Sequence, residues 1–320
     1  MSIIINVVVV LLIAFNIYNL KNVYKDVKEL YKIHKERQTK RKKTKMKLQE
    51  RKLNLNKTLQ ELKNIDLETP LYAEFTQAEM TYFLKVTQKL KEENTEIFIF
   101  ASELLKHVKL ENMRNFMKSA PFITIHQHPL KETEKSDGRI KAGSYTLESK
   151  EIDIYLEDNN STLYHELLHA ASSDFTYNVS GFNIHLESGE SLGKGLNEGY
   201  TELLNKRFFD KKNKSYIRLQ KLAELIELFY ENKEDMVTDY FNADIFGLIG
   251  ELLKSMTLEE AIDIIVDIDG FLNSNLNTID YLKLKQKILK LYEKSPVIIN
   301  QNQKPMQKSK LLVKSLFNEK

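Results

Sequence analysis

The sequence contains one pentapeptide whose residue types and spacing could support chemistry, His165-Glu-Leu-Leu-His169. In an α-helix, residues four apart lie on the same face and about 6 Å apart along the axis. The imidazoles of His165 and His169 can therefore converge on one metal ion. Glu166 would then lie beside a metal-bound water and could accept its proton. The motif predicts a divalent metal site with a general base.

The segment around this motif, residues 161–172, has the pattern of an amphipathic helix. Its leucines and alanines form one apolar arc, whereas His165 and His169 lie on the opposite side. Ser161 or Asn160 is the expected N-cap, because a short polar side chain there can accept hydrogen bonds from the first N–H groups. A histidine of the core would lie within the apolar arc, so we expect the two histidines to face a cleft or solvent.

A second amphipathic helix is expected over residues 193–208, where apolar residues recur at helical intervals. Glu198 and Glu202 fall together on its other face. Taken alone, such a pair indicates a solvated acidic face. After an HExxH motif, however, a site with two histidines needs a third protein ligand, and the usual oxygen donor is a carboxylate. We therefore expect Glu198 to be the third ligand and Glu202 to orient a ligating imidazole.

Three short strands are expected upstream of the motif, in residues 121–126, 139–147 and 151–156. Three residues separate the last two strands, which suits a hairpin. An exposed strand near the metal would let an extended peptide pair with it through main-chain hydrogen bonds. Together with the helices, these strands predict an α+β fold with a small, mainly antiparallel sheet.

HELLH followed by Asn197-Glu-Gly-Tyr-Thr-Glu202 resembles the zincin metallopeptidases of the gluzincin group. The resemblance covers residues 121–208 and is specific at these two motifs. Residues 170–197 form a longer connection than is typical of thermolysin-like enzymes. The resemblance implies a zincin-like metallopeptidase domain with a helical C-terminal lobe, and a peptide or protein as substrate.

The same resemblance implies roles for individual residues. His165, His169 and Glu198 would hold Zn²⁺ and leave one position for water. Glu166 would accept the proton of that water during attack on the amide carbonyl and return it to the leaving amine. Glu202 would be the carboxylate behind a ligating imidazole.

Five other aromatic or imidazole side chains are candidates for a role at this site. His185, Tyr177 and Tyr200 are candidates for stabilising the oxyanion, but each is better explained as a strand or core residue, so that role is unassigned. His126 and His128 form a His-x-His pair, which is interpreted as polar alternation along a strand rather than as a metal pair.

The composition restricts the kind of metal site. The chain has 320 residues with 42% hydrophobic content, enough for a sizeable core. It contains no cysteine, which excludes disulfides and thiolate zinc sites. Any metal must therefore be held by histidine and carboxylate.

Residues 1–20 are interpreted as a single-pass transmembrane anchor, because residues 3–20 carry no charge and about 20 apolar residues cross a bilayer. They show neither the basic start nor the small-residue cleavage site of a signal peptide. A buried helix or strand is the alternative interpretation.

Residues 21–65 are expected to form a basic helical juxtamembrane region. Residues 21–57 contain 15 Lys or Arg and 4 Asp or Glu, an excess of 11 positive charges. Because the net charge of the whole chain is +3, all other residues together carry a net charge of −8. Lys and Arg concentrated just after a membrane span predict that this side, and with it the catalytic domain, is cytoplasmic. The basic region could be a solvated helix face or could contact anionic lipid. Nucleic acid is not an expected partner, because few aromatic residues are interleaved.

Residues 66–294 are the expected zincin-like domain, and residues 295–320 a linker with a short basic tail. Thr257 and Glu260 are spaced as a capping box at the start of a helix. The sequence thus predicts a membrane-anchored zinc metallopeptidase. The alternative is a noncatalytic membrane-anchored scaffold with a degenerate zincin domain, for which the identity of Glu166 would not matter.

Overall fold

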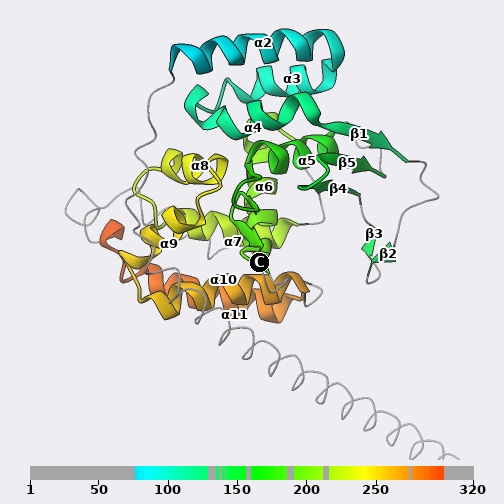
Figure 1. Ribbon diagram of the computed structural model, residues 1–320. Coiled ribbons are helices and arrows are strands. Elements are labelled where there is room, and N and C mark those ends of the chain that lie inside the picture. The colour runs from blue at the N-terminus through cyan, green and yellow to red at the C-terminus, as the bar shows by residue number, and fades with distance from the viewer. Residues whose placement is uncertain are drawn as a thin grey trace, which may run out of the picture. The chain divides into compact units, whose positions relative to one another are not determined.

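A computed structural model describes most of the expected catalytic domain (Figure 1). The expected anchor 1–20, the basic region 21–65 and most of the expected tail lie outside the described residues. No helix in the described part has the length and apolar content needed to span a bilayer. The described ranges are 76–128, 135–136, 139–140, 142–155, 160–185, 191–211, 216–273 and 276–298.

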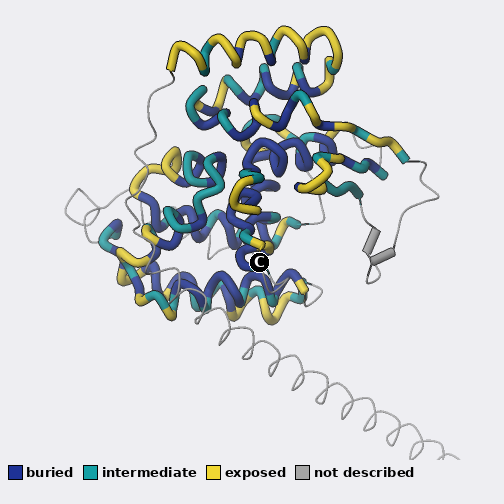
Figure 2. The backbone as a smooth tube through the Cα atoms, viewed as in Figure 1, coloured by how far each residue is buried: buried dark blue, intermediate teal, exposed yellow. Residues whose placement is uncertain are grey.

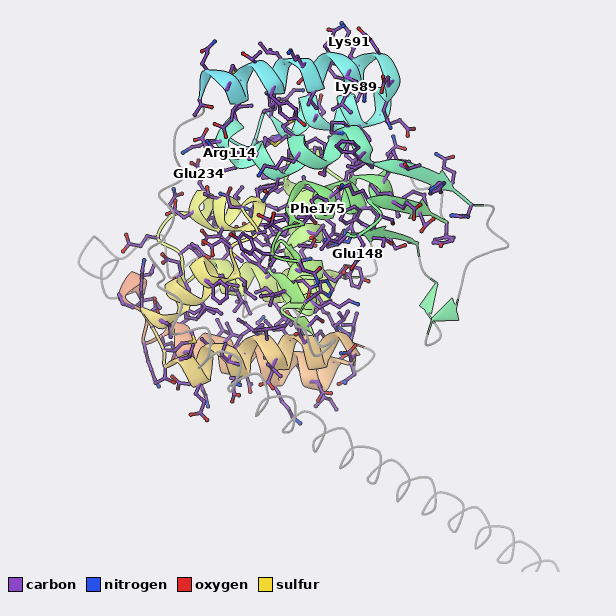
Figure 3. All side chains as sticks on the ribbon, in the orientation of Figure 1. Lys89, Lys91, Arg114, Glu148, Phe175 and Glu234 are labelled. Atoms are coloured by element: carbon purple, nitrogen blue, oxygen red, sulfur yellow. The ribbon has the colours of Figure 1, made fainter. Side chains whose placement is uncertain are left out.

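These residues form many helices and small sheets, so the expected α+β class is confirmed. The first helices are α2 (Gln77–Glu93), α3 (Thr95–Leu104) and α4 (Arg114–Ser119), with 3₁₀ turns η1 (Leu110–Met113) and η2 (Ala120–Phe122). Thr76 and Glu79 form a capping box at the start of α2. Arg114 of α4, labelled in Figure 3, donates a 2.9 Å hydrogen bond to the same Glu79 and so ties α4 to α2.

A three-stranded sheet follows, with the order β1 (Thr124–Gln127), β5 (Glu151–Ile154), β4 (Gly143–Thr146). Strands β4 and β5 are antiparallel, which confirms the expected hairpin, whereas β1 is parallel to β5. The strand expected over 139–147 is divided into β3 (Arg139–Ile140), which pairs with β2 (Lys135–Ser136), and β4. Ile152 and Ile154 are buried, and β4 forms one edge of the sheet.

Helices α5 (Ser161–Ala171) and α6 (Lys194–Phe209) correspond to the two helices expected to carry the site. The connection between them contains a four-stranded sheet of short antiparallel strands, which the sequence did not predict. These strands follow one another in the order β6 (Ser173–Asp174), β7 (Val179–Ser180), β8 (Asn183–His185) and β9 (Ser191–Leu192).

The rest of the described chain is helical, as expected for the C-terminal lobe. Thr257 and Glu260 form the predicted capping box, with the Glu260 N–H donating to Thr257 Oγ1 at 3.2 Å. Helices α7 and α10 pack on α6, and Figure 2 shows the buried residues concentrated along α5, α6 and α10. The helices of this lobe are α7 (Ile217–Glu227), α8 (Lys233–Phe241), α9 (Ile245–Leu253), α10 (Leu258–Asn273) and α11 (Thr278–Tyr292).

Candidate metal site

Helix α5 is buried on nearly every side, because α4 and the strands β4 and β5 contact it as well as α6. His165 is 3% exposed and His169 is 7% exposed. The expectation of a solvent-facing position is therefore wrong, because α6 covers the polar face of α5. Asn160 occupies the N-cap position with φ 63°, but its side chain makes no capping hydrogen bond, so the expected capping role is not observed there.

Three side chains of α5 and α6 bring donor atoms together. His165 Nε2 lies 3.1 Å from His169 Nε2 and 3.3 Å from Glu198 Oε2, and His169 Nε2 lies 3.8 Å from the same oxygen. A tetrahedral ion with bonds of about 2.0–2.1 Å separates its ligand atoms by about 3.4 Å. We call His165, His169 and Glu198 the metal group, because they could hold a metal ion. Among the residues that the structure describes, no other group of three His, Asp or Glu side chains could do so.

Glu202 lies behind His165, one helical turn after Glu198. It is 1% exposed, and its Oε2 lies 3.1 Å from His165 Nδ1. Both ring nitrogens of His165 therefore face a carboxylate. Burial disfavours the charged imidazolium, but hydrogen bonds to Glu198 and Glu202 and the charge of Glu166 outweigh it and raise the pKa of His165 to about 10.

Burial likewise opposes the ionised form of Glu198, yet the two histidines hold the pKa of its carboxyl well below the usual range. The charge of the Glu198 carboxylate is thus compensated by the positive charge of the His165 imidazole. A bound divalent cation would compensate the same carboxylate, so the electrostatics of this group favour a cation among its donor atoms.

The other ring nitrogen of His169 is also surrounded by polar groups. Its Nδ1 lies 3.1 Å from Asn197 Nδ2 and 3.4 Å from Thr201 Oγ1, and Thr201 Oγ1 lies 2.6 Å from Tyr240 OH. The Phe182 N–H donates to Asn197 Oδ1 at 3.1 Å. These contacts hold the imidazole in one orientation. Sequence reasoning missed them, although Asn197 and Thr201 directly precede the two glutamates on the same helix.

Glu166 lies against the edge strand β4. A Cβ atom placed on Gly143 would lie 3.1 Å from Glu166 Oε1 and 2.6 Å from Thr162 Cγ2. Only glycine therefore allows this strand to approach α5 so closely. The arrangement puts the candidate base, which is 7% exposed, next to an edge strand of the sheet.

The three oxyanion candidates have other surroundings. Tyr177 is 74% exposed, and Tyr200 is fully buried with its hydroxyl 3.5 Å from Glu227. His185, on β8, contacts the side chain of Asn183. Another aromatic side chain, Tyr216, contacts a proposed ligand directly: its ring is stacked on His165 with 6.0 Å between centroids. No local sequence pattern indicated Tyr216, because it precedes a different helix.

The His-x-His pair lies at β1, outside the metal group. His128 Nε2 lies 2.7 Å from Asp153 Oδ1, and its ring is stacked on Tyr155. His126 Nε2 lies 3.8 Å from Glu151 Oε1, and both of these side chains are about half exposed. These contacts agree with the interpretation of the pair as polar residues of a strand.

Comparison of the chain with family models, with curated proteins and with solved structures gave no match. The chemical interpretation of the site therefore depends on its geometry and on the two sequence motifs.

Replacing Glu202 by Gln is expected to weaken metal binding by about 10- to 100-fold, because the ligating His165 loses the charged acceptor at Nδ1. Competition with a chromophoric chelator measures the zinc affinity. Glu224→Gln, in a half-buried glutamate of α7, is the control and should bind as the wild type does. Equal affinity in Glu202→Gln and wild type would exclude this role for Glu202.

Proposed function

We propose that the chain is a zinc-dependent metallopeptidase of the zincin type, which hydrolyses peptide bonds. One observation carries the proposal: the donor atoms of His165, His169 and Glu198 lie 3.1 to 3.8 Å apart. Two imidazoles and one carboxylate are typical of catalytic zinc sites, which keep the fourth position for water, whereas structural sites usually have four protein ligands.

Zinc is the proposed metal because of the donor types. Imidazole nitrogen suits zinc and other first-row transition metals, whereas magnesium and calcium prefer all-oxygen sites. The separations of the donor atoms also suit zinc bonds of about 2.0–2.1 Å. Glu202 Oε2 behind His165 and Thr201 Oγ1 behind His169 can each accept a hydrogen bond from the Nδ1–H of the ring, which would keep both rings in place to receive the ion.

Zinc in this site would supply a Lewis acid that polarises the scissile carbonyl and lowers the pKa of water toward neutrality. Glu166 accepts the proton of the attacking water and later gives it to the leaving amine, so one carboxylate serves as base and then as acid. Its place beside β4 brings the proton acceptor to the strand on which the substrate is proposed to lie.

The proposed substrate is an extended segment of a peptide or protein. In the three-stranded sheet, β4 pairs with β5 on one side, and its other edge can form main-chain hydrogen bonds with an added strand. Gly143 lies in this strand against Glu166, so a peptide bound along the edge would pass the general base.

The proposal includes a membrane location, which is supported by the sequence alone. Residues 1–20 would anchor the chain, and the excess of Lys and Arg in residues 21–57 would keep the catalytic domain cytoplasmic, with anionic lipid as an additional contact.

The test is the metal content of the full chain, purified in detergent. We expect one zinc per chain and hydrolysis of an unstructured protein such as casein. A chelator should remove both the metal and the activity, and added zinc should restore both. A chain that neither contains zinc nor binds it on titration would overturn the proposal, as would hydrolysis that persists in the metal-free protein.

A further inference from the structure

We propose that Asp269, a buried residue of α10, is a positioning residue of the metal site. Its carboxylate holds the N-terminus of α6 and thereby fixes where Glu198 lies. Asp269 is 2% exposed, and it accepts hydrogen bonds from the Gly193 N–H at 2.9 Å and the Gly195 N–H at 2.7 Å. The inference rests on the proposed function, because it assumes that Glu198 binds a metal.

Helix α6 cannot cap its own N-terminus. The first N–H groups of an α-helix have no partner within the helix, and a Ser, Thr, Asp or Asn side chain at the N-cap usually accepts one of them. The N-cap residue of α6 is Gly193, which has no side chain. Asp269, which lies more than 70 residues later, supplies the missing acceptors. Its negative charge is also favoured at the positive end of the helix dipole.

The two glycines are required for this arrangement. Gly193 has φ 87°, and a Cβ atom there would lie 1.9 Å from the Phe182 carbonyl oxygen. A Cβ atom on Gly195 would lie 2.6 Å from the Ile268 carbonyl oxygen. Both distances are too short for any other residue. Gly195 thus lets the backbone of α6 lie against α10 beside Asp269, and Gly193 lets the start of α6 lie against the backbone of Phe182.

The capped end of α6 is close to the metal group. Glu198 follows Gly195 by three residues, which is less than one helical turn and about 4.5 Å along the axis. Glu198 Oε2 lies 3.3 Å from His165 Nε2 and 3.8 Å from His169 Nε2. It would have to bind the same ion as these two nitrogen atoms. Metal–ligand distances tolerate only about 0.2 Å of error. A small displacement of the start of α6 would therefore weaken the coordination.

Asp269→Asn tests this inference in the full chain. The variant keeps the size of the side chain but turns an amide donor toward one of the two N–H groups. We expect the zinc affinity to fall by about tenfold or more, measured with a competing chromophoric chelator. The visible spectrum of the Co²⁺-loaded chain should change as well, because it reports the coordination geometry. Circular dichroism checks that the variant is folded.

The matched control is Asp263→Asn, on the same helix, where the side chain is 35% exposed and lies 4.0 Å from Lys287. It should leave the zinc affinity and the Co²⁺ spectrum unchanged. If Asp269→Asn does not fold, Asp269→Ser takes its place, because serine keeps one acceptor and adds no amide donor.

A double-mutant cycle with Glu198→Ala separates positioning from a general structural effect. If Asp269 acts through Glu198, Asp269→Asn should reduce the zinc affinity only while Glu198 is present. An equal reduction in both backgrounds would overturn the inference. So would wild-type affinity in Asp269→Asn, and in that case the proposed function would stand. A wild-type chain that binds no zinc would overturn the proposed function and this inference together.

Discussion

Glu166→Gln is expected to keep the zinc and to lose most of the peptidase activity. Glutamine has nearly the same shape, so His165 and His169 on the same helix should remain in place. Its amide cannot accept a proton at neutral pH, and a positioned general base contributes about 10²- to 10⁴-fold to the rate. We therefore expect kcat to fall by that factor. The zinc stoichiometry of the full chain tests whether the metal is kept. Steady-state hydrolysis of a peptide by the full chain tests whether kcat falls.

Glu148→Gln is a suitable control, because this exposed glutamate, labelled in Figure 3, lies in the turn between β4 and β5. It should have normal activity. Retained turnover in Glu166→Gln would exclude Glu166 as the base. The alternative is a noncatalytic scaffold with a degenerate zincin domain. For a scaffold, Glu166→Gln would have no effect in the cell.

The geometry of the metal group was predictable where it depends on local structure. Four-residue spacing on a helix places His165 beside His169, and the same spacing places Glu198 beside Glu202. Bringing the two helices together required a chemical argument, since a site with two histidines needs a third ligand. The structure places Glu198 against both histidines.

The parts that depend on tertiary packing were not predictable. The pattern of α5 distinguishes its polar face from its apolar face, but it does not show what covers the polar face. Helix α6 covers it, so the histidines are buried rather than exposed. Asp269 and Tyr240 come from α10 and α8, and no local pattern links either residue to the motif. The parallel pairing of β1 with β5 likewise depends on the path of the chain between them.

His169→Ala is expected to have the largest effect on the metal. The free energy of zinc binding to four-ligand structural sites is about 10–16 kcal/mol, so each ligand contributes about 2.5–4 kcal/mol. Losing one ligand therefore weakens binding by about 10²- to 10³-fold. At a zinc concentration of about 100 times the wild-type Kd, bound zinc stabilises the wild type against unfolding by about 2.7 kcal/mol. At the same concentration, a variant whose Kd is at least 100-fold higher is stabilised by about 0.4 kcal/mol or less. Thermal unfolding with and without zinc should therefore show a metal-dependent increase in Tm that the variant loses.

Comparing each variant with and without zinc is essential, because removing the His169 ring also removes its contacts with Asn197 and Thr201 and lowers the stability of the metal-free chain. His128→Ala is the matched control: it removes another imidazole, paired with Asp153 at 2.7 Å, outside the metal group. Its increase in Tm with zinc should equal that of the wild type. If His169→Ala kept the full increase, the zinc would have to bind elsewhere, and His165 and Glu198 would have to be reinterpreted as a buried ion pair.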